Sequence, residues 1–183
     1  MSAHLIADGP EIDRMIRRLA LEIAERNHGL ERVAFVGIQT RGVPLARRLL
    51  AALEPVEKQR PPSGTLDITF YRDDFAQPDF DPRVKATELA FDVTGMTIVL
   101  VDDVLYTGRT IRAAMDEIVD FGRPAAIQLA VLVDRGGREL PIEPTFVGMK
   151  VPVRGDESVH VRFSETDDQP DSIKVVKRGG EAK

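Results

Sequence analysis

The stretch from residue 98 to residue 110 constrains the fold of this chain more than any other part of its sequence. It opens with the apolar residues 98–101, which predict a buried parallel strand because a strand covered on both faces shows no polar alternation. Two adjacent carboxylates, Asp102 and Asp103, close this strand. After a short loop, a segment begins whose apolar residues recur at helical spacing. The order of strand, acidic pair, loop and helix is typical of an α/β protein with a mainly parallel sheet.

The loop that enters this helix is suited to a phosphate group. The first turn of a helix presents unpaired N–H groups and the positive end of the helix dipole. Thr107 and Thr110 add hydroxyl donors, and Gly108 lets the backbone approach an anion closely. Asp102 and Asp103 would repel the same phosphate, so we expect them to bind vicinal sugar hydroxyls or a divalent cation through water. A ligand with phosphate, hydroxyls and magnesium is a sugar phosphate.

Length and composition limit the class of protein. The 183 residues suit one domain with a sizeable core, and no linker divides them, so we expect a single domain over residues 1–183. The net charge of −5 argues against a protein that is basic overall but leaves a local basic face open. The absence of cysteine excludes disulfides and thiolate metal sites. No apolar run is long enough for a membrane span or a signal peptide, which favours a cytoplasmic protein without membrane contact.

Other apolar patterns predict more elements of the same kind. Asp8, a potential capping residue, and Pro10 predict the start of a helix whose apolar face spans 12–23 and which ends near residues 27–29. A second helix is predicted at 43–53, and strands at 33–38, 66–70, 127–133, 145–149 and 159–163. Ligands of open α/β sheets bind beyond the carboxyl ends of the strands, so the loop 39–42 and the acidic pair can share one crevice. The irregular stretch at about 71–94 is typical of a functional lid, although a merely mobile insertion is also compatible with it.

The stretch 98–110 resembles the 5-phosphoribosyl-1-pyrophosphate (PRPP) signature of the type I phosphoribosyltransferases. The resemblance implies a mainly parallel, Rossmann-like sheet flanked by helices, with a flexible lid loop and a small hood. The hood would comprise the chain from about residue 134 onward and the N-terminal segment. Residues 37–42 resemble the pyrophosphate loop of the same enzymes, in which an arginine holds the leaving group. We assign that role to Arg41.

The resemblance also implies site residues and a cofactor. Asp102, Asp103 and Arg41 would be catalytic, and the two aspartates would hold Mg²⁺, mainly through water. The residues expected to bind PRPP or UMP are Thr40, Arg41, Arg72, Asp102, Asp103, Val104, Leu105, Tyr106, Thr107, Gly108, Arg109 and Thr110.

From about residue 12 to residue 152 the chain is also similar to the PyrR family of bifunctional pyrimidine operon regulators. The similarity rests on segments at 25–27, 37–42, 67–74, 98–112, 119–124 and 127–141. It implies a uracil phosphoribosyltransferase that also binds leader messenger RNA in response to UMP or UTP, by transcription attenuation or translational control. Residues expected near the uracil are Val133, Asp134, Arg135 and Arg138. A homodimer or a higher oligomer is expected.

The chain departs from this family at positions that face RNA. Basic or hydrogen-bonding residues of the family are replaced here by Leu21, Gln39, Glu143 and Met149, and such losses weaken electrostatic binding to RNA. The remaining candidates for a basic face are Arg14, Arg17, Arg18, Arg26 and Arg138.

Two rival interpretations stay open from the residues. One is an RNA-binding regulator whose pocket only senses nucleotides, and the other is a phosphoribosyltransferase for another base, because the PRPP signature reads the sugar and not the base. The three histidines, His4, His28 and His160, are scattered without zinc-ligand spacing. The sequence has no Walker lysine loop and no Gly-x-Gly-x-x-Gly motif, which counts against an ATPase or a dinucleotide-binding protein.

Overall fold

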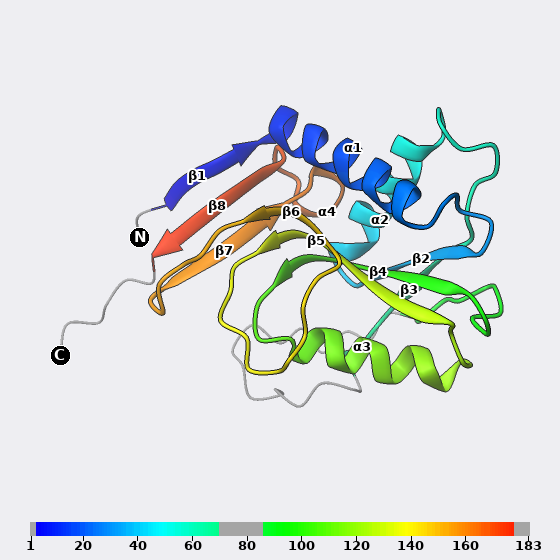
Figure 1. Cartoon of the computed structure of the whole chain (residues 1–183). Helices are drawn as coiled ribbons and strands as arrows, with labels where there is room; N and C mark the ends of the chain where they lie inside the picture. Colours follow the sequence, from blue (N-terminus) through cyan, green and yellow to red (C-terminus); the bar gives the residue numbers. More distant parts are fainter. Residues whose placement is uncertain (1–2, 70–85, 178–183) are drawn as a thin grey trace.

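The computed structural model describes residues 3–69 and 86–177, which form two sheets with helices packed around the larger one (Figure 1). The larger sheet is parallel throughout, with the strand order β3-β2-β4-β5-β6. Its strands are β2 (Val33–Ile38), β3 (Ser63–Leu66), β4 (Thr97–Leu105), β5 (Ala126–Asp134) and β6 (Phe146–Lys150). This is the α/β fold with a mainly parallel sheet that the sequence predicts.

Helices cover both faces of the parallel sheet. Helices α1 (Gly9–Arg26) and α2 (Gly42–Leu53) lie on one face, and α3 (Arg109–Asp120) lies on the other (Figure 1). Side chains alternate along the central strand β4, so Val99 and Val101 pack with α1 and α2, whereas Ile98 and Leu100 pack with α3. All four side chains are fully buried. The apolar run at the start of the signature is therefore explained by a strand covered on both faces.

Helix α1 begins at a complete capping box. The Asp8 carboxylate accepts a hydrogen bond from the Glu11 N–H, and the Glu11 carboxylate accepts one from the Asp8 N–H, each at 3.0 Å. Pro10 occupies the first turn, where its missing N–H costs no helical hydrogen bond. The helix ends at Arg26, close to the predicted end.

A second, antiparallel sheet lies beside the first (Figure 1). It has the order β1-β8-β7, with β1 (Ala3–Asp8), β7 (Glu157–Arg162) and β8 (Ser172–Lys177). Strands β1 and β8 were not predicted from the sequence. These two strands are far apart in the sequence and pair with each other, for instance Ala3 with Val176. A local sequence pattern cannot reveal such a distant pairing partner. The single-turn helix α4 (Ser164–Asp167) connects β7 to β8.

Two predicted boundaries were wrong. The strand predicted at 66–70 lies instead at 63–66, because pairing with β2 runs from Phe35 opposite Ser63 to Ile38 opposite Leu66 and ends where β2 ends. The strand of the signature does not close at the acidic pair. It continues to Leu105 because β5 extends alongside as far as Asp134.

The predicted lid falls partly outside the described residues, since residues 70–85 are not among them, and Arg72 falls there too. In the described part, Glu88 forms a bridge with Thr65 through two backbone hydrogen bonds of 2.9 Å. Residues 89–93 include Leu89, Phe91 and Val93, which pack on the apolar cluster below the sheet. The division into one domain with a lid and a hood stays a prediction. No helix in the described ranges has the length and apolar character that crossing a membrane requires.

Candidate active site

The two predicted loops meet at the carboxyl end of the parallel sheet. Strands β2 and β4 are parallel neighbours, with Gly37 opposite Val101, so the loops that follow them start at the same end of the sheet. Gly42, at the start of α2, packs directly on the backbone of β4, where an added Cβ would clash with the carbonyl oxygen of Val101. The pyrophosphate loop and the acidic pair are thus held in direct contact.

The two carboxylates of the signature lie at the end of this sheet with restricted access to water. Asp102 is buried and Asp103 is half-buried, and the Asp103 N–H donates a hydrogen bond of 2.9 Å to Oδ1 of Asp102. Burial raises the pKa of Asp103, and the positive charge of Arg41 opposes that rise. The charges of Arg41 and Asp103 therefore lie close enough to interact.

The signature loop is shaped by its contacts with the segment that follows β5. Gly108 precedes α3 with a φ of 93°, a left-handed conformation that favours glycine. The carbonyl oxygen of Thr107 accepts hydrogen bonds from the N–H groups of Glu139 and Leu140 at 3.0 and 3.1 Å. The N-cap residue Gly108 has no side chain, and within the described ranges only the Arg109 N–H donates to a side chain, the Thr107 hydroxyl at 3.3 Å, so the first turn of α3 remains suited to an anion. Arg109, also expected at the ligand, pairs with Glu139 at 2.7 Å.

Arg138 connects the same two segments. Its Nη1 donates to the carbonyl oxygen of Tyr106 at 3.1 Å, its Nε donates to that of Ile142 at 2.8 Å, and its Nη2 pairs with Asp134 at 2.8 Å. Only 15% of the side chain is exposed. These contacts give Arg138 a structural role at the base of the signature loop, and its role toward RNA stays a prediction.

Arg135 and Tyr106 form a stacked pair on the side expected to face uracil. The Arg135 guanidinium lies 3.7 Å from the centre of the Tyr106 ring, and its Nη2 donates to the carbonyl oxygen of Glu157 at 3.3 Å. Gly137 lies against the same ring, so a Cβ there would come within 2.7 Å of it. Val133, by contrast, is fully buried in the core, and its side chain is removed from the surface of the site.

Arg41 has a partner that sequence reasoning missed. Its Nη2 lies 2.5 Å from Oδ1 of Asp167, and its Nε donates to Oδ2 of the same carboxylate at 3.1 Å. The hydrogen bond from Arg41 is the main cause that lowers the pKa of Asp167 to about 2. Asp167 lies 126 residues further along the chain, in α4, and no motif marks it in the sequence. Thr40, next to Arg41, is exposed.

Four of the five arginines expected to bind RNA lie on α1, whereas Arg138 lies apart from them at the signature loop. Arg14, Arg17, Arg18 and Arg26 are exposed on α1. Arg18 is engaged by Glu22 at 2.7 Å and donates to the carbonyl oxygen of Gly148 at 2.5 Å. Leu21, one of the departures from the family pattern, is 52% exposed on the same helix.

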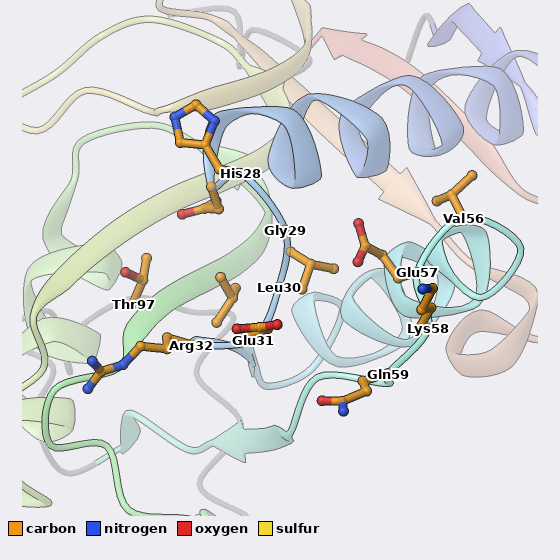
Figure 2. A pocket seen from close by; sticks show the side chains of 12 residues that line it. His28, Gly29, Leu30, Glu31, Arg32, Val56, Glu57, Lys58, Gln59 and Thr97 are labelled. Carbon is orange, nitrogen blue, oxygen red and sulfur yellow. The ribbon is translucent and has the colours of Figure 1, made fainter.

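A cavity of about 540 Å³ lies at the opposite end of the sheet, at the amino ends of its strands (Figure 2). It is formed by the turn after α1, the connection after α2 and Thr97. Val33 and Thr97, the first residues of β2 and β4, line it, so it opens at the amino ends of the strands. This cavity is therefore separate from the strand ends that carry the signature.

The acidic pair fits what Mg²⁺ requires when it accompanies a diphosphate. Mg²⁺ keeps several waters and takes one or two protein carboxylates together with the phosphates of its ligand. Asp102 and Asp103 supply that number of carboxylates. In residues 3–69 and 86–177 there is no group of three or more His, Cys, Asp or Glu side chains that could hold a metal alone. The donor set thus matches a metal that is shared with the substrate.

Comparison with known proteins places this geometry in a family. The phosphoribosyl transferase domain matches residues 2–168. The chain belongs to the phosphoribosyltransferase family. It is 56% identical to the Bifunctional protein PyrR of Roseiflexus sp. (strain RS-1) over 177 residues, which is 97% of both chains. It is 50% identical to the Bifunctional protein PyrR of Thermus thermophilus over 175 residues, 96% of each chain. Within the phosphoribosyltransferases, the chain therefore belongs with the PyrR proteins.

Solved structures show the same phosphoribosyltransferase fold. A hypoxanthine-guanine phosphoribosyltransferase from Bacillus anthracis aligns with a TM-score of 0.71 at 17% identity, covering 96% of this chain and 99% of its own. A hypoxanthine phosphoribosyltransferase from Trypanosoma cruzi aligns with a TM-score of 0.73 at 17% identity and 94% coverage of both chains. At this level of identity the likeness concerns the fold alone and does not select a base.

Proposed function

We propose that this chain transfers a 5-phosphoribosyl group from PRPP to uracil, giving UMP and pyrophosphate, and that it also regulates pyrimidine genes by binding leader messenger RNA. The observation that carries the proposal is an intact PRPP signature at the end of β4, in a chain that is similar to PyrR proteins along nearly its whole length. Because RNA and PRPP are its partners, the proposal places the chain in the cytoplasm, as a homodimer or a higher oligomer.

The reaction requires neutralisation of the charge on the leaving pyrophosphate more than it requires a nucleophilic side chain. Cleavage at the anomeric carbon of PRPP develops positive charge on the ribose and negative charge on the departing pyrophosphate. Arg41 would bind the leaving group, and the first turn of α3 with Thr107 and Thr110 would bind the 5-phosphate. Asp102 and Asp103 would bind the ribose hydroxyls and favour the developing positive charge.

Phosphoribosyltransferases generally use Mg²⁺ with PRPP. When bound at Asp102 and Asp103, the ion would supply Lewis-acid stabilisation of the pyrophosphate. The residues expected beside uracil are Asp134, Arg135 and Arg138, with Val133 acting through the position of its backbone because its side chain is buried. Arg72 belongs to the proposed PRPP set from the sequence alone.

The regulatory part of the proposal rests on the PyrR relationship and on the arginines of α1. Arginines bind phosphate through two parallel donors and can stack on unpaired bases, which is how RNA loops are usually recognised. Arg26 lies exposed at the end of α1 and is retained from the family pattern. Whether the regulation acts on transcription or on translation follows from the leader RNA and not from these residues.

One preparation tests both parts. Uracil, cytosine, hypoxanthine, guanine and adenine are each incubated with PRPP and Mg²⁺, and the nucleotide products are separated by chromatography. The proposal predicts UMP from uracil and no product from the purines. The same preparation is then titrated with a pyrimidine-operon leader RNA and a scrambled control, with and without UMP. Turnover of a purine would assign the chain to another base, and equal binding of both RNAs would remove the regulatory role.

A further inference from the structure

Among residues 3–69 and 86–177, only Asp167 is hydrogen-bonded to the guanidinium of Arg41. Asp167 receives the Nε–H at 3.1 Å and faces Nη2 at 2.5 Å, so it occupies the edge formed by these two nitrogens. A guanidinium carries five N–H donors in a rigid fork. The Asp167 contacts use two of them, which leaves both hydrogens of Nη1 and one of Nη2 for a second anion. With 39% of its side chain exposed, Arg41 is accessible to a ligand.

The Asp167 carboxylate is itself fixed before any ligand arrives. Its Oδ2 accepts a hydrogen bond from the Phe163 N–H at 3.0 Å and another from the Thr166 hydroxyl at 2.9 Å. Its side chain is only 13% exposed. A carboxylate with this many donors keeps one orientation and passes that orientation to the guanidinium that it binds.

The turn that carries Asp167 is anchored to α2 at a second point. Arg48 of α2 pairs with Glu165 at 2.6 Å and also with Asp171, and its guanidinium lies 4.8 Å from the centre of the Phe163 ring. Arg41 immediately precedes α2 and Arg48 lies within it, so two arginines seven positions apart dock on one acidic segment, 164–171. The position of Asp167 relative to the pyrophosphate loop is thus set by contacts that do not involve Arg41.

We propose that Asp167 is a positioning residue for binding the pyrophosphate group in phosphoribosyl transfer: it holds the Nε edge of Arg41 so that the remaining donors face the diphosphate of PRPP. The proposal rests on the role assigned above to Arg41. It makes the C-terminal segment, which contains no part of the PRPP signature, a determinant of PRPP affinity. Asp167 acts through Arg41 and does not touch the substrate.

The test compares Asp167→Asn with Glu165→Gln. Both changes remove one carboxylate from the same turn while keeping side-chain size, but Glu165 contacts Arg48 and not Arg41. Pyrophosphate affinity is measured by calorimetry with Mg²⁺, and the KM values for PRPP and uracil are measured by product assay. Asp167→Asn is expected to weaken pyrophosphate binding and to raise the KM for PRPP by roughly tenfold, with the KM for uracil unchanged. Glu165→Gln is expected to leave all three values within about twofold of the wild type.

A double-mutant cycle separates positioning from a general structural effect. In the Arg41→Ala background, Asp167→Asn is expected to change pyrophosphate affinity no further, because the residue that it positions is gone. Additive losses would overturn the proposal, as would tighter pyrophosphate binding by Asp167→Asn, which would mean that the carboxylate competes with the ligand. Thermal unfolding of each variant shows that the compared proteins are folded. Pyrophosphate binding is measured without a base, so a failure of uracil transfer alone leaves this test intact.

Discussion

The α-carbon of Gly42 lies against the carbonyl oxygen of Val101, and no side chain fits between them. This contact joins the pyrophosphate loop to the strand that carries the acidic pair. Gly37 is equally enclosed, because a Cβ there would lie 2.6 Å from the carbonyl oxygen of Gly42. The loop 37–42 is therefore shaped by close backbone packing as well as by its charged side chain.

Gly42→Ala is expected to lower the free energy of unfolding by about 1–3 kcal/mol, since overpacking forces backbone shifts of that cost. The same shift would displace Arg41 and raise the KM for PRPP. Urea denaturation and product assays measure the two effects. Gly155→Ala is the matched control, because a Cβ at Gly155 meets nothing within 4 Å. Equal stability of the two variants would contradict the packing argument.

Arg41→Ala is expected to weaken PRPP binding or turnover by tenfold or more, as a rough estimate from the loss of a charge-assisted pair with a polyanion. The KM for PRPP and the turnover number are obtained from initial rates at varied PRPP concentration. Arg60→Ala removes an exposed arginine that pairs with Glu54 at 3.5 Å, and it should leave these kinetics unchanged. Normal PRPP kinetics in Arg41→Ala would show that the arginine has only a structural role.

Glu117 predicts a pH dependence of stability. Its carboxyl is buried on the inner face of α3, accepts a hydrogen bond of 2.5 Å from the Thr87 hydroxyl, and has one oxygen, Oε2, without a hydrogen-bond partner. Burial is the main cause that raises its pKa, and the negative charges of Asp67 and Asp120 add to the rise. The folded state therefore binds the proton more tightly than the unfolded state does.

It follows that the contribution of Glu117 to stability is present below its unfolded pKa and is lost as pH rises through its folded value. As the pH rises from 4 to 8, the melting temperature of Glu117→Gln should therefore increase relative to that of the wild type. Asp116→Asn, on the exposed side of the same helix, serves as the control. A difference that does not vary with pH would show that Glu117 is not buried as a proton-binding group.

RNA binding should depend on salt and on the arginines of α1. Arg26→Ala is expected to weaken binding to a pyrimidine-operon leader RNA without loss of transferase activity, and to make the dependence on salt less steep. Gel-shift titrations at two salt concentrations measure both. Arg112→Ala, in α3 on the other face of the sheet, is the control. An unchanged affinity in Arg26→Ala would remove this helix end from the RNA surface.

The parallel sheet and its helices could be predicted because their signals are local. The run at 98–101 needs burial on both faces, and Asp8 with Pro10 marks the start of the first helix within three residues. The features that the sequence did not predict depend on residues far apart in the chain. Strand β8 is stabilised by pairing with β1, about 170 positions away. Asp167 can be recognised as a site residue only from its ion pair with Arg41, which forms when the chain folds. Side chains that act through distant partners leave no pattern in the sequence.

Conversion of labelled uracil to UMP by the wild type and by the double variant Asp102→Asn with Asp103→Asn tests the central claim most directly. The account predicts Mg²⁺- and PRPP-dependent formation of UMP by the wild type. In the double variant it predicts loss of UMP formation with the fold retained, because both changes keep side-chain shape at the end of β4 and remove only charge. Circular dichroism and thermal unfolding check the fold. Unchanged turnover in a folded double variant would contradict the assignment of phosphoribosyl transfer to this strand end.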